Sequence, residues 1–247
     1  MPATAIVPVK ALDLAKSRLA LPPGERRQLA LAFATDTLDA LLACPDIGAV
    51  VVITADPDVA ALAAARQAHV VPDSTDSLDA AIADAVARSG MPSAHLPATS
   101  VLIAPADLPC LRSADVTEVL RLAAGHTTAF VPDRSGAGTT MTLFAAGQRV
   151  VTGYGADSAA RHTGMGLYAV PAPPLRARHD VDTVADLREA VALGVGAATE
   201  AVQRAGDAGG LQAGELRHQR LTLRRCEQQP LPAVAIAGLL HDVAFVE

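Results

Sequence analysis

A short basic stretch near the start of the chain has the composition of a phosphate-binding loop. It holds Lys10, Lys16 and Arg18, and cations so close together can offset several negative phosphate oxygens at once. The simpler alternative is a basic turn that water solvates. The pattern G-x-x-x-x-G-K-[S/T] does not occur in the sequence, which excludes a Walker-type loop as the way in which these residues bind phosphate.

Carboxylates that suit a hard cation stand in two other segments. Asp107 lies between two prolines in the segment 105–109, and Asp180 and Asp182 are two positions apart. In an extended chain, residues at that spacing point the same way. Magnesium takes oxygen ligands and often uses only one or two protein carboxylates beside substrate phosphates, so these aspartates are candidate metal ligands. The alternative is that Asp107 caps a turn and that Asp182, with Asp186, caps the last predicted helix.

Glycines and hydroxyls occur together in two further segments. In the segment 132–140, two glycines precede Thr139, and backbone N–H groups and a hydroxyl there could cradle an anion. Gly155 is followed by Asp157 and Ser158, either of which could cap a short helix whose N-terminus binds phosphate or carboxylate. The alternatives are a hairpin loop whose glycines take positive φ, and capping alone.

The elements that would position these segments follow from the hydrophobic pattern. Short apolar runs alternate with longer stretches of helical period from the start to about Arg204, which predicts a three-layer α/β fold around a mostly parallel sheet. Ligands of such sheets bind outside the carboxyl ends of the strands. The predicted strands are 4–9, 49–54, 69–71, 100–104, 128–131, 140–144 and 167–170. The predicted helices are 22–45, 56–68, 77–88, 113–124 and 184–193, with a stop at Gly90 and a loop at 92–99.

The composition excludes several classes of protein. The 247 residues have 51% apolar and 19% charged side chains, which is too apolar for a disordered chain. Aromatic residues make up only 2%, which weighs against binding of single-stranded nucleic acid by base stacking. The net charge of -6 offers no broad basic surface for duplex DNA or for an anionic membrane.

The domain organisation and location are expected to be simple. A linker signal at 206–210 divides a domain at 1–204 from a C-terminal extension at 205–247 of unknown role. The apolar stretch 233–240 is too short to span a membrane, and Lys10 interrupts the first apolar run, so no leader is expected. The three cysteines are far apart and form no C-x-x-C pair, which fits apolar thiols in a reducing compartment. We expect a cytoplasmic protein.

The order of these motifs resembles a known family. The motifs are Pro8-Val-Lys10, Ala15-Lys-Ser-Arg-Leu19, Pro105-Ala-Asp-Leu-Pro109, Gly136-Ala-Gly-Thr-Thr140, the Gly155/Ser158 element and Asp180-Val-Asp-Thr183. Over residues 3 to 204 the chain resembles the guanylyltransferases of deazaflavin coenzyme (F-420) biosynthesis. The resemblance implies a nucleotidyltransferase-like (Rossmann-like) α/β/α fold with a mixed sheet. It also implies Mg2+-dependent transfer of GMP from GTP to 2-phospho-L-lactate or phosphoenolpyruvate, with release of pyrophosphate.

The resemblance also implies roles for individual residues. Asp107 and Asp180 would hold magnesium, with Asp182 as a helper. The phosphate or carboxylate of the acid would be bound by Thr139, Gly155 and Ser158. The triphosphate would lie near the catalytic cations Lys10, Lys16 and Arg18.

One segment departs from the pattern of the family. Members of the family usually carry a glycine-rich stretch followed by Leu-Asn, and this stretch is expected to contact the nucleotide. The corresponding segment of this chain, 73–79, has no glycine and ends in Asp79. An ionised aspartate can accept a hydrogen bond from the N–H edge of guanine but cannot donate one. The sequence therefore leaves open the base preference and the activity itself. The alternatives are a nucleotidyltransferase with another acceptor, such as 3-phosphoglycerate, a sugar phosphate or a molybdopterin-type compound, a non-catalytic nucleotide-binding module, and a scaffold that works through the C-terminal extension. The sequence also leaves open whether the chain forms a homodimer.

Overall fold

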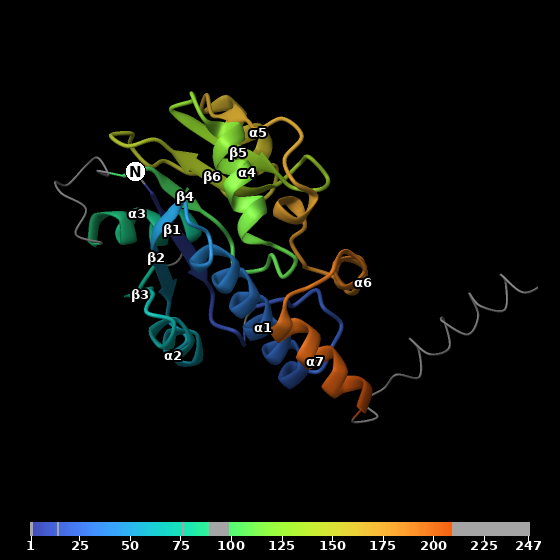
Figure 1. Cartoon of the computed structure of the whole chain (residues 1–247). Coiled ribbons are helices and arrows are strands. Elements are labelled where there is room, and N and C mark those ends of the chain that lie inside the picture. The colour runs from blue at the N-terminus through green and yellow to red at the C-terminus, as the bar shows by residue number, and fades with distance from the viewer. Residues whose placement is uncertain (1, 14, 76, 89–98, 209–247) are drawn as a thin grey trace, which may run out of the picture. The chain divides into compact units, whose positions relative to one another are not determined.

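The architecture is a mixed sheet with helices on both faces. The computed structural model describes residues 2–13, 15–75, 77–88 and 99–208. In this part of the chain, seven strands form one sheet in the order β3-β2-β1-β4-β6-β5-β7 (Figure 1). Their bounds are Ala3–Val9 (β1), Ile47–Thr54 (β2), His69–Pro72 (β3), Val101–Ile103 (β4), Thr128–Pro132 (β5), Thr139–Phe144 (β6) and Tyr168–Ala169 (β7). Among these strands, β6 pairs antiparallel with both β4 and β5, and the other pairings are parallel.

The helices begin where the sequence provides start signals. Pro23 stands at the first turn of α1, where its missing N–H costs no hydrogen bond. Asp56 caps α2 by accepting from the N–H groups of Asp58 and Val59. The helices are Pro23–Leu42 (α1), Pro57–Ala65 (α2), Leu78–Arg88 (α3), Ser113–Ala123 (α4), Ser158–Gly164 (α5), Val184–Leu193 (α6) and Ala197–Ala208 (α7), with a 3-10 turn at Leu175–Arg178.

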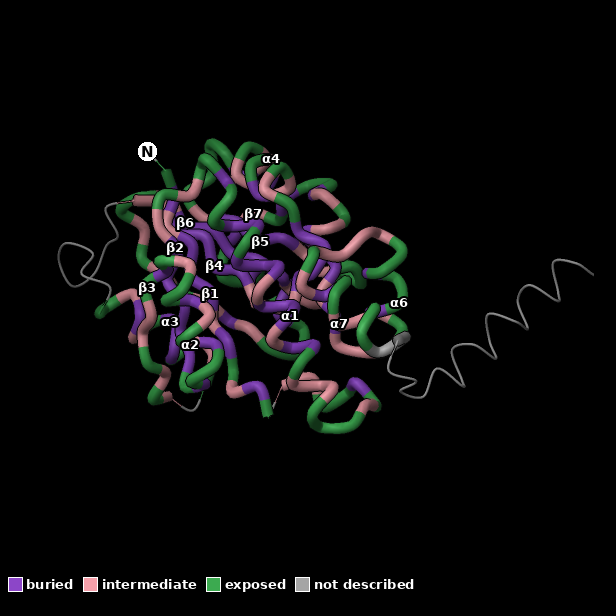
Figure 2. Tube along the Cα trace, turned by 60° about the horizontal axis from the view of Figure 1, so that its bottom comes forward, coloured by how far each residue is buried: buried purple, intermediate pink, exposed green. Residues whose placement is uncertain are grey.

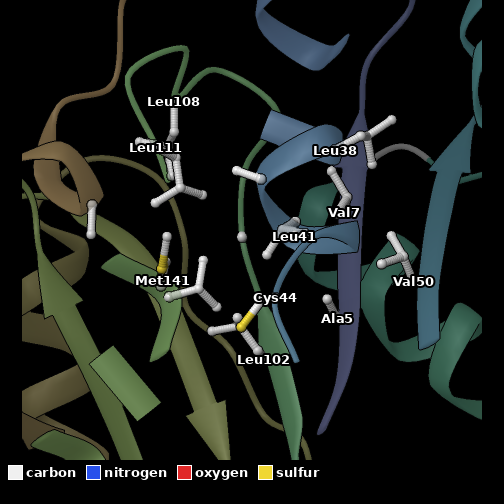
Figure 3. Close-up of a cluster of buried hydrophobic side chains, with 14 of the residues drawn as sticks. Ala5, Val7, Leu38, Leu41, Cys44, Val50, Leu102, Leu108, Leu111 and Met141 are labelled. Carbon is white, nitrogen blue, oxygen red and sulfur yellow. The ribbon is translucent and has the colours of Figure 1, made fainter. Parts of the chain in front are cut away.

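The sheet is buried on both faces. One apolar cluster joins α1, α2 and α4 to β1, β2, β4, β5 and β6. Figure 3 shows part of it, with Leu38 and Leu41 of α1 beside Val7 of β1 and Leu102 of β4. A second cluster packs α3 and α5 against the opposite face. Figure 2 shows the buried strands enclosed by more exposed helices. The predicted three-layer α/β fold is confirmed.

Some predicted boundaries were wrong for local reasons. Helix α2 ends at Ala65 instead of 68, because Gln67 takes a positive φ of 60° that a helix cannot continue through. The predicted side-chain cap of α5 does not form, since Asp157 is left-handed and makes no capping hydrogen bond. Strand β7 covers only Tyr168–Ala169 of the predicted 167–170. The stop at Gly90 falls outside the described residues, as do all but the last residue of the loop at 92–99.

Helix α7 was not predicted, because the residue that starts it is far away in the sequence. Asp36 on α1 is 5% exposed, and its carboxylate accepts from the N–H groups of Ala198 and Thr199 at 2.9 and 3.0 Å. A Cβ on Gly196 would lie 2.3 Å from this carboxylate. A distant side chain thus provides the N-cap of α7.

The segment Met1–Gln203 forms one compact unit, and 209–247 lies outside the described residues. Within the residues described, no helix is long and apolar enough to cross a membrane.

Candidate active site

The topology gathers the predicted site residues at one edge of the sheet. From β1 the chain moves to β2 and β3 on one side and then to β4 on the other, and ligands of open α/β sheets bind at such a switch point. Lys10 follows β1, and Asp107 follows β4, at the carboxyl ends of parallel strands. Thr139 begins the antiparallel strand β6, so it lies at the same edge. The strand directions therefore predict a shared site.

Lys16 is the centre of an ion-pair cluster at this edge. Its ammonium contacts Oδ2 of Asp107 and lies 3.0 Å from Oδ1 of Asp182. The lysine side chain is only 9% exposed, so burial alone would lower its pKa, yet the charges of the two aspartates raise that pKa above its ordinary value. Lys16 also takes a left-handed φ of 55°. Such a backbone conformation is uncommon for a residue other than glycine.

The other two predicted cations are placed differently. Arg18 pairs with Oδ2 of Asp182, and its side chain is 71% exposed. Lys10 is exposed, and within the described residues no ion pair engages it. The three cations thus form a gradient from a buried ion pair to a solvent-facing ammonium. Arg18 and Lys10 are the ones accessible to an incoming polyanion.

The start of the basic loop is anchored to α2. The N–H of Leu12 donates to Oδ2 of Asp56 at 2.9 Å, and Arg27 of α1 donates to the same oxygen at 3.1 Å. Burial would raise the pKa of Asp56, but these hydrogen bonds lower it. Asp56 is therefore charged at neutral pH and holds the loop that carries Lys10 and Lys16.

Asp107 and Asp180 form a crowded acidic pair. The N–H of Val181 donates to the carbonyl of Asp107 at 3.1 Å, which brings the segment after the 3-10 turn against the loop after β4. Burial, together with the charges of Asp107 and Asp182, raises the pKa of Asp180 to about 7. Oδ1 of Asp107 is buried and has no hydrogen-bond partner in the part of the chain described. A buried acceptor without a donor is the kind of group that a cation would satisfy.

The three predicted metal ligands do not converge on one point. Over the described ranges, no group of three or more acidic, histidine or cysteine side chains has the arrangement of a metal site. Asp182 instead pairs with Lys16 and Arg18. Both oxygens of Asp182 are engaged in this way, whereas Asp107 pairs with Lys16 through Oδ2 and leaves Oδ1 without a partner among the described residues. Asp107 and Asp180 are therefore the carboxylates that could hold a metal, and one or two carboxylates are enough for a magnesium ion that also binds substrate phosphates.

The glycine loop before β6 is held by its own side chains. Asp133 accepts from Ser135 Oγ at 2.8 Å and from the N–H of Gly136 at 2.7 Å, and Ser135 Oγ accepts from the N–H of Ala137 at 3.1 Å. The predicted positive φ at Gly136 is present, at 80°. The N–H groups of Gly136 and Ala137 already donate within the loop, so two of the backbone donors of the predicted cradle are engaged. Thr139, which follows the loop, is partly exposed.

Thr139 and the 153–155 segment meet at a buried histidine. Thr139 Oγ1 lies 2.9 Å from Nδ1 of His162, and the N–H of Gly153 donates to Nε2 of the same ring at 3.0 Å. Ser158, the first residue of α5, is 2% exposed. Gly155 is exposed and takes a φ of 108°, a conformation that favours glycine. The structure thus brings Thr139 to the segment that precedes Ser158.

Asp79 holds the same segment from the other side. Its Oδ1 accepts from Thr152 Oγ1 at 2.6 Å and from the N–H of Tyr154 at 3.2 Å. Asp79 stands in the first turn of α3. The residue predicted to contact the nucleotide is therefore tied to the loop predicted to contact the acid.

Comparison with known proteins identifies the family. The family model for CofC-like guanylyl transferases matches residues 3–204. The phosphoenolpyruvate guanylyltransferase of Streptomyces coelicolor is 45% identical over 205 residues, which cover 81% of this chain and 94% of that protein. The chain belongs to the CofC-like guanylyl transferases. It is therefore a nucleotidyltransferase, as the order of its motifs predicts.

Solved structures of lower sequence similarity share the fold of this guanylyl transferase. A protein from Desulfovibrio desulfuricans G20 described as a nucleotide-diphospho-sugar transferase is 18% identical, with a TM-score of 0.61 over 84% of this chain and 96% of that one. A nucleotidyl transferase from Methanothermobacter thermautotroptrophicus is 17% identical, with a TM-score of 0.54 over 78% and 97%. These likenesses confirm the nucleotidyltransferase-like architecture.

His162 was not predicted as a site residue of this guanylyl transferase. A lone histidine on a short helix carries no motif, and the residue is fully buried. Its position was the available signal, because His162 stands four residues after Ser158 and residues at that spacing share one face of a helix.

Proposed function

We propose that this CofC-like guanylyl transferase transfers GMP from GTP to a phosphorylated three-carbon acid, phosphoenolpyruvate or 2-phospho-L-lactate, in the biosynthesis of coenzyme F-420. The observation that carries the proposal is the cluster of Lys16, Asp107 and Asp180 at the switch point of a nucleotidyltransferase fold. The similarity to the phosphoenolpyruvate guanylyltransferase of Streptomyces coelicolor supports the choice of a guanine nucleotide and of this class of acid.

The proposed reaction needs charge neutralisation more than base catalysis. A phosphate oxygen of the acid forms a new bond to the α-phosphorus of GTP, and the bond from that phosphorus to the β-phosphate bridging oxygen breaks. Pyrophosphate leaves with the electron pair. The attacking oxygen is already anionic at neutral pH, so the main task is to hold two polyanions together and in line.

The cations of the basic loop suit that task. Lys10 and Arg18 are exposed and would contact phosphate oxygens, where fixed positive charge stabilises the transition state. Lys16 is already paired with Asp107 and Asp182, so in the proposal it orients the carboxylates as well as facing the phosphates.

Asp107 and Asp180 fit a magnesium ion. The unpaired buried oxygen of Asp107 and the crowding of negative charge around Asp180 would both be relieved by a hard cation. Bound there, magnesium would offset the negative charge of the triphosphate. In the proposal, Thr139, Gly155 and Ser158 would bind the phosphate or carboxylate of the acid.

The test is pyrophosphate release from GTP and magnesium in the presence of phosphoenolpyruvate, 2-phospho-L-lactate or 3-phosphoglycerate, with ATP and CTP in parallel. The proposal predicts release with GTP and one of the first two acids. Release only with 3-phosphoglycerate would show that the proposed acceptor is wrong, and release only with ATP or CTP would show that the proposed nucleotide is wrong. Binding of GTP without release under any combination would contradict an enzymatic role.

A further inference from the structure

His162 has two hydrogen-bond partners of different kinds. The N–H of Gly153 points at Nε2 with a separation of 3.0 Å, and Thr139 Oγ1 lies 2.9 Å from Nδ1. A backbone N–H can only donate, so Nε2 must be the accepting nitrogen without a proton. The ring is therefore neutral, and its proton is on Nδ1, where it donates to the hydroxyl of Thr139.

The direction of that hydrogen bond determines what Thr139 can do. A threonine hydroxyl has one proton and two acceptor sites. Because His162 supplies a proton to Thr139 Oγ1, the hydroxyl accepts on that side and keeps its own proton to donate elsewhere. Thr139 is partly exposed, so the proton is available to an anionic group of a ligand.

The surroundings of His162 keep the ring neutral and fixed in place. The ring is fully buried and packs against Phe130 and Tyr154, with ring centroids 5.7 and 5.3 Å away. Burial lowers the pKa of His162, the charge of Arg161 lowers it further, and the charge of Asp79 raises it. A protonated ring would place an N–H against the N–H of Gly153, which the geometry does not allow.

We infer that His162 is the positioning residue of the acceptor site: it holds Thr139 and Gly153 together and directs the hydroxyl proton of Thr139 toward the phosphorylated acid. The inference deepens the proposed function and rests on it for the identity of the acid. The hydrogen-bond directions themselves follow from the fold alone.

Replacement by glutamine separates the two contacts. In His162→Gln the amide oxygen can take the place of Nε2 and accept from Gly153, but no donor remains at the position of Nδ1. The KM for the acid should rise ~5- to 10-fold, the scale of one lost hydrogen bond, while the KM for GTP changes less than ~2-fold. His162→Asn, whose amide nitrogen can take the place of Nδ1, should retain the contact to Thr139 and raise that KM less. His69→Gln, at an exposed histidine of β3, is the matched control.

A double-mutant cycle tests whether His162 acts through Thr139. In a Thr139→Val background the hydroxyl is gone, so His162→Gln should add less than ~2-fold to the KM for the acid. Equal effects of His162→Gln in both backgrounds would overturn the inference, because they would show that the histidine does not act through the hydroxyl of Thr139. Thermal unfolding of each variant reports that contribution separately.

Nitrogen NMR of the free protein tests the tautomer without any substrate. Long-range proton–nitrogen correlations should show Nδ1 of His162 protonated and Nε2 unprotonated at neutral pH. A protonated Nε2 would overturn the inference even if the enzyme transfers GMP as proposed. The predicted tautomer together with no turnover on any acid would instead contradict the proposed function and leave the geometry of His162 intact.

Discussion

The two sides of the candidate site are built from different interactions. The side formed by the basic loop and the loop after β4 is held by full charges, with Lys16 between Asp107 and Asp182. The side formed by β6, α5 and the 152–155 segment is held largely by hydrogen bonds around a neutral ring, His162. The charged side is suited to stabilising developing charge, which has large effects on rate. The neutral side is suited to placing a small ligand, which has effects on the scale of single hydrogen bonds.

Substitution on the charged side should cause the largest loss. Asp107→Asn removes the charge of a proposed metal ligand, and turnover should fall at least ~100-fold, the scale of a lost key electrostatic group. The measurement is the rate of pyrophosphate release at saturating GTP and acid. Asp84→Asn, at an α3 aspartate paired with Arg88, should retain normal turnover. Near-normal turnover in Asp107→Asn would show that Asp107 is not a metal ligand. It would also contradict the expectation that the charged side of the site has the larger effect on rate.

Lys16 should contribute to both stability and rate. Lys16→Met leaves Asp107 and Asp182 without their central cation, so turnover should fall ~10-fold or more, and the free energy of unfolding should fall by ~1–3 kcal/mol. Since the pKa of Lys16 is raised in the folded state, the stabilisation is complete below the ordinary lysine pKa of ~10.4 and is lost as the pH rises through the folded value.

Urea unfolding at neutral and alkaline pH measures this effect. The wild-type protein should lose stability at high pH more steeply than Lys16→Met. Parallel pH curves for the two proteins would contradict the role of the ion pairs.

Asp79 should separate a loop-holding role from a charge effect. Asp79→Asn keeps the accepting oxygen for Thr152 and Tyr154, and it should change the KM for the acid less than ~2-fold. Asp79→Ala removes that oxygen and should raise the same KM ~3- to 5-fold. Steady-state kinetics with both substrates varied would show the difference. If Asp79→Asn and Asp79→Ala were equally impaired, the negative charge of Asp79 would be the important property. The side of the site around the 152–155 segment would then also depend on a full charge.

Asp56 should act chiefly on stability, because the side chain anchors a helix and a loop and is not proposed to contact a ligand. Asp56→Ala removes the N-cap of α2 and the anchor of the Leu12 N–H, so the free energy of unfolding should fall by ~1–2 kcal/mol. Because the pKa of Asp56 is lowered on folding, this stabilisation is present above the ordinary pKa of ~3.9 and is lost as the pH falls through the folded value. Urea unfolding between neutral and acidic pH should show the two proteins converging in acid. A constant difference across that range would show that the carboxylate charge is not involved.

The parts of the molecule that could be predicted are those determined locally. The β-branched run at 49–54 predicts a buried strand, and Asp56 before Pro57 predicts the start of α2. Parallel strands bring Asp107 to the edge that holds Lys10, and this general rule located the charged side.

What could not be predicted depends on contacts between distant residues. Helix α7 begins at a cap from Asp36 on α1, and Asp79 reaches Thr152 across the chain. His162 acquires its role only when β6 and the 153–155 segment contact it, and its spacing of four residues from Ser158 was the one sequence feature that could have pointed to the site. A single neutral, buried side chain is harder to recognise as a site residue from the sequence than a cluster of charged residues.

The most direct test of the account is to identify the products by phosphorus NMR. Wild-type enzyme would be incubated with GTP, magnesium and either phosphoenolpyruvate or 2-phospho-L-lactate, and Asp107→Asn would be the control. With one of the acids the products should be free pyrophosphate and a new diphosphate that joins GMP to the acid, formed by the wild type at least ~100-fold faster than by the variant. GDP and inorganic phosphate as the products, or an unchanged spectrum with each of the acids, would contradict the account.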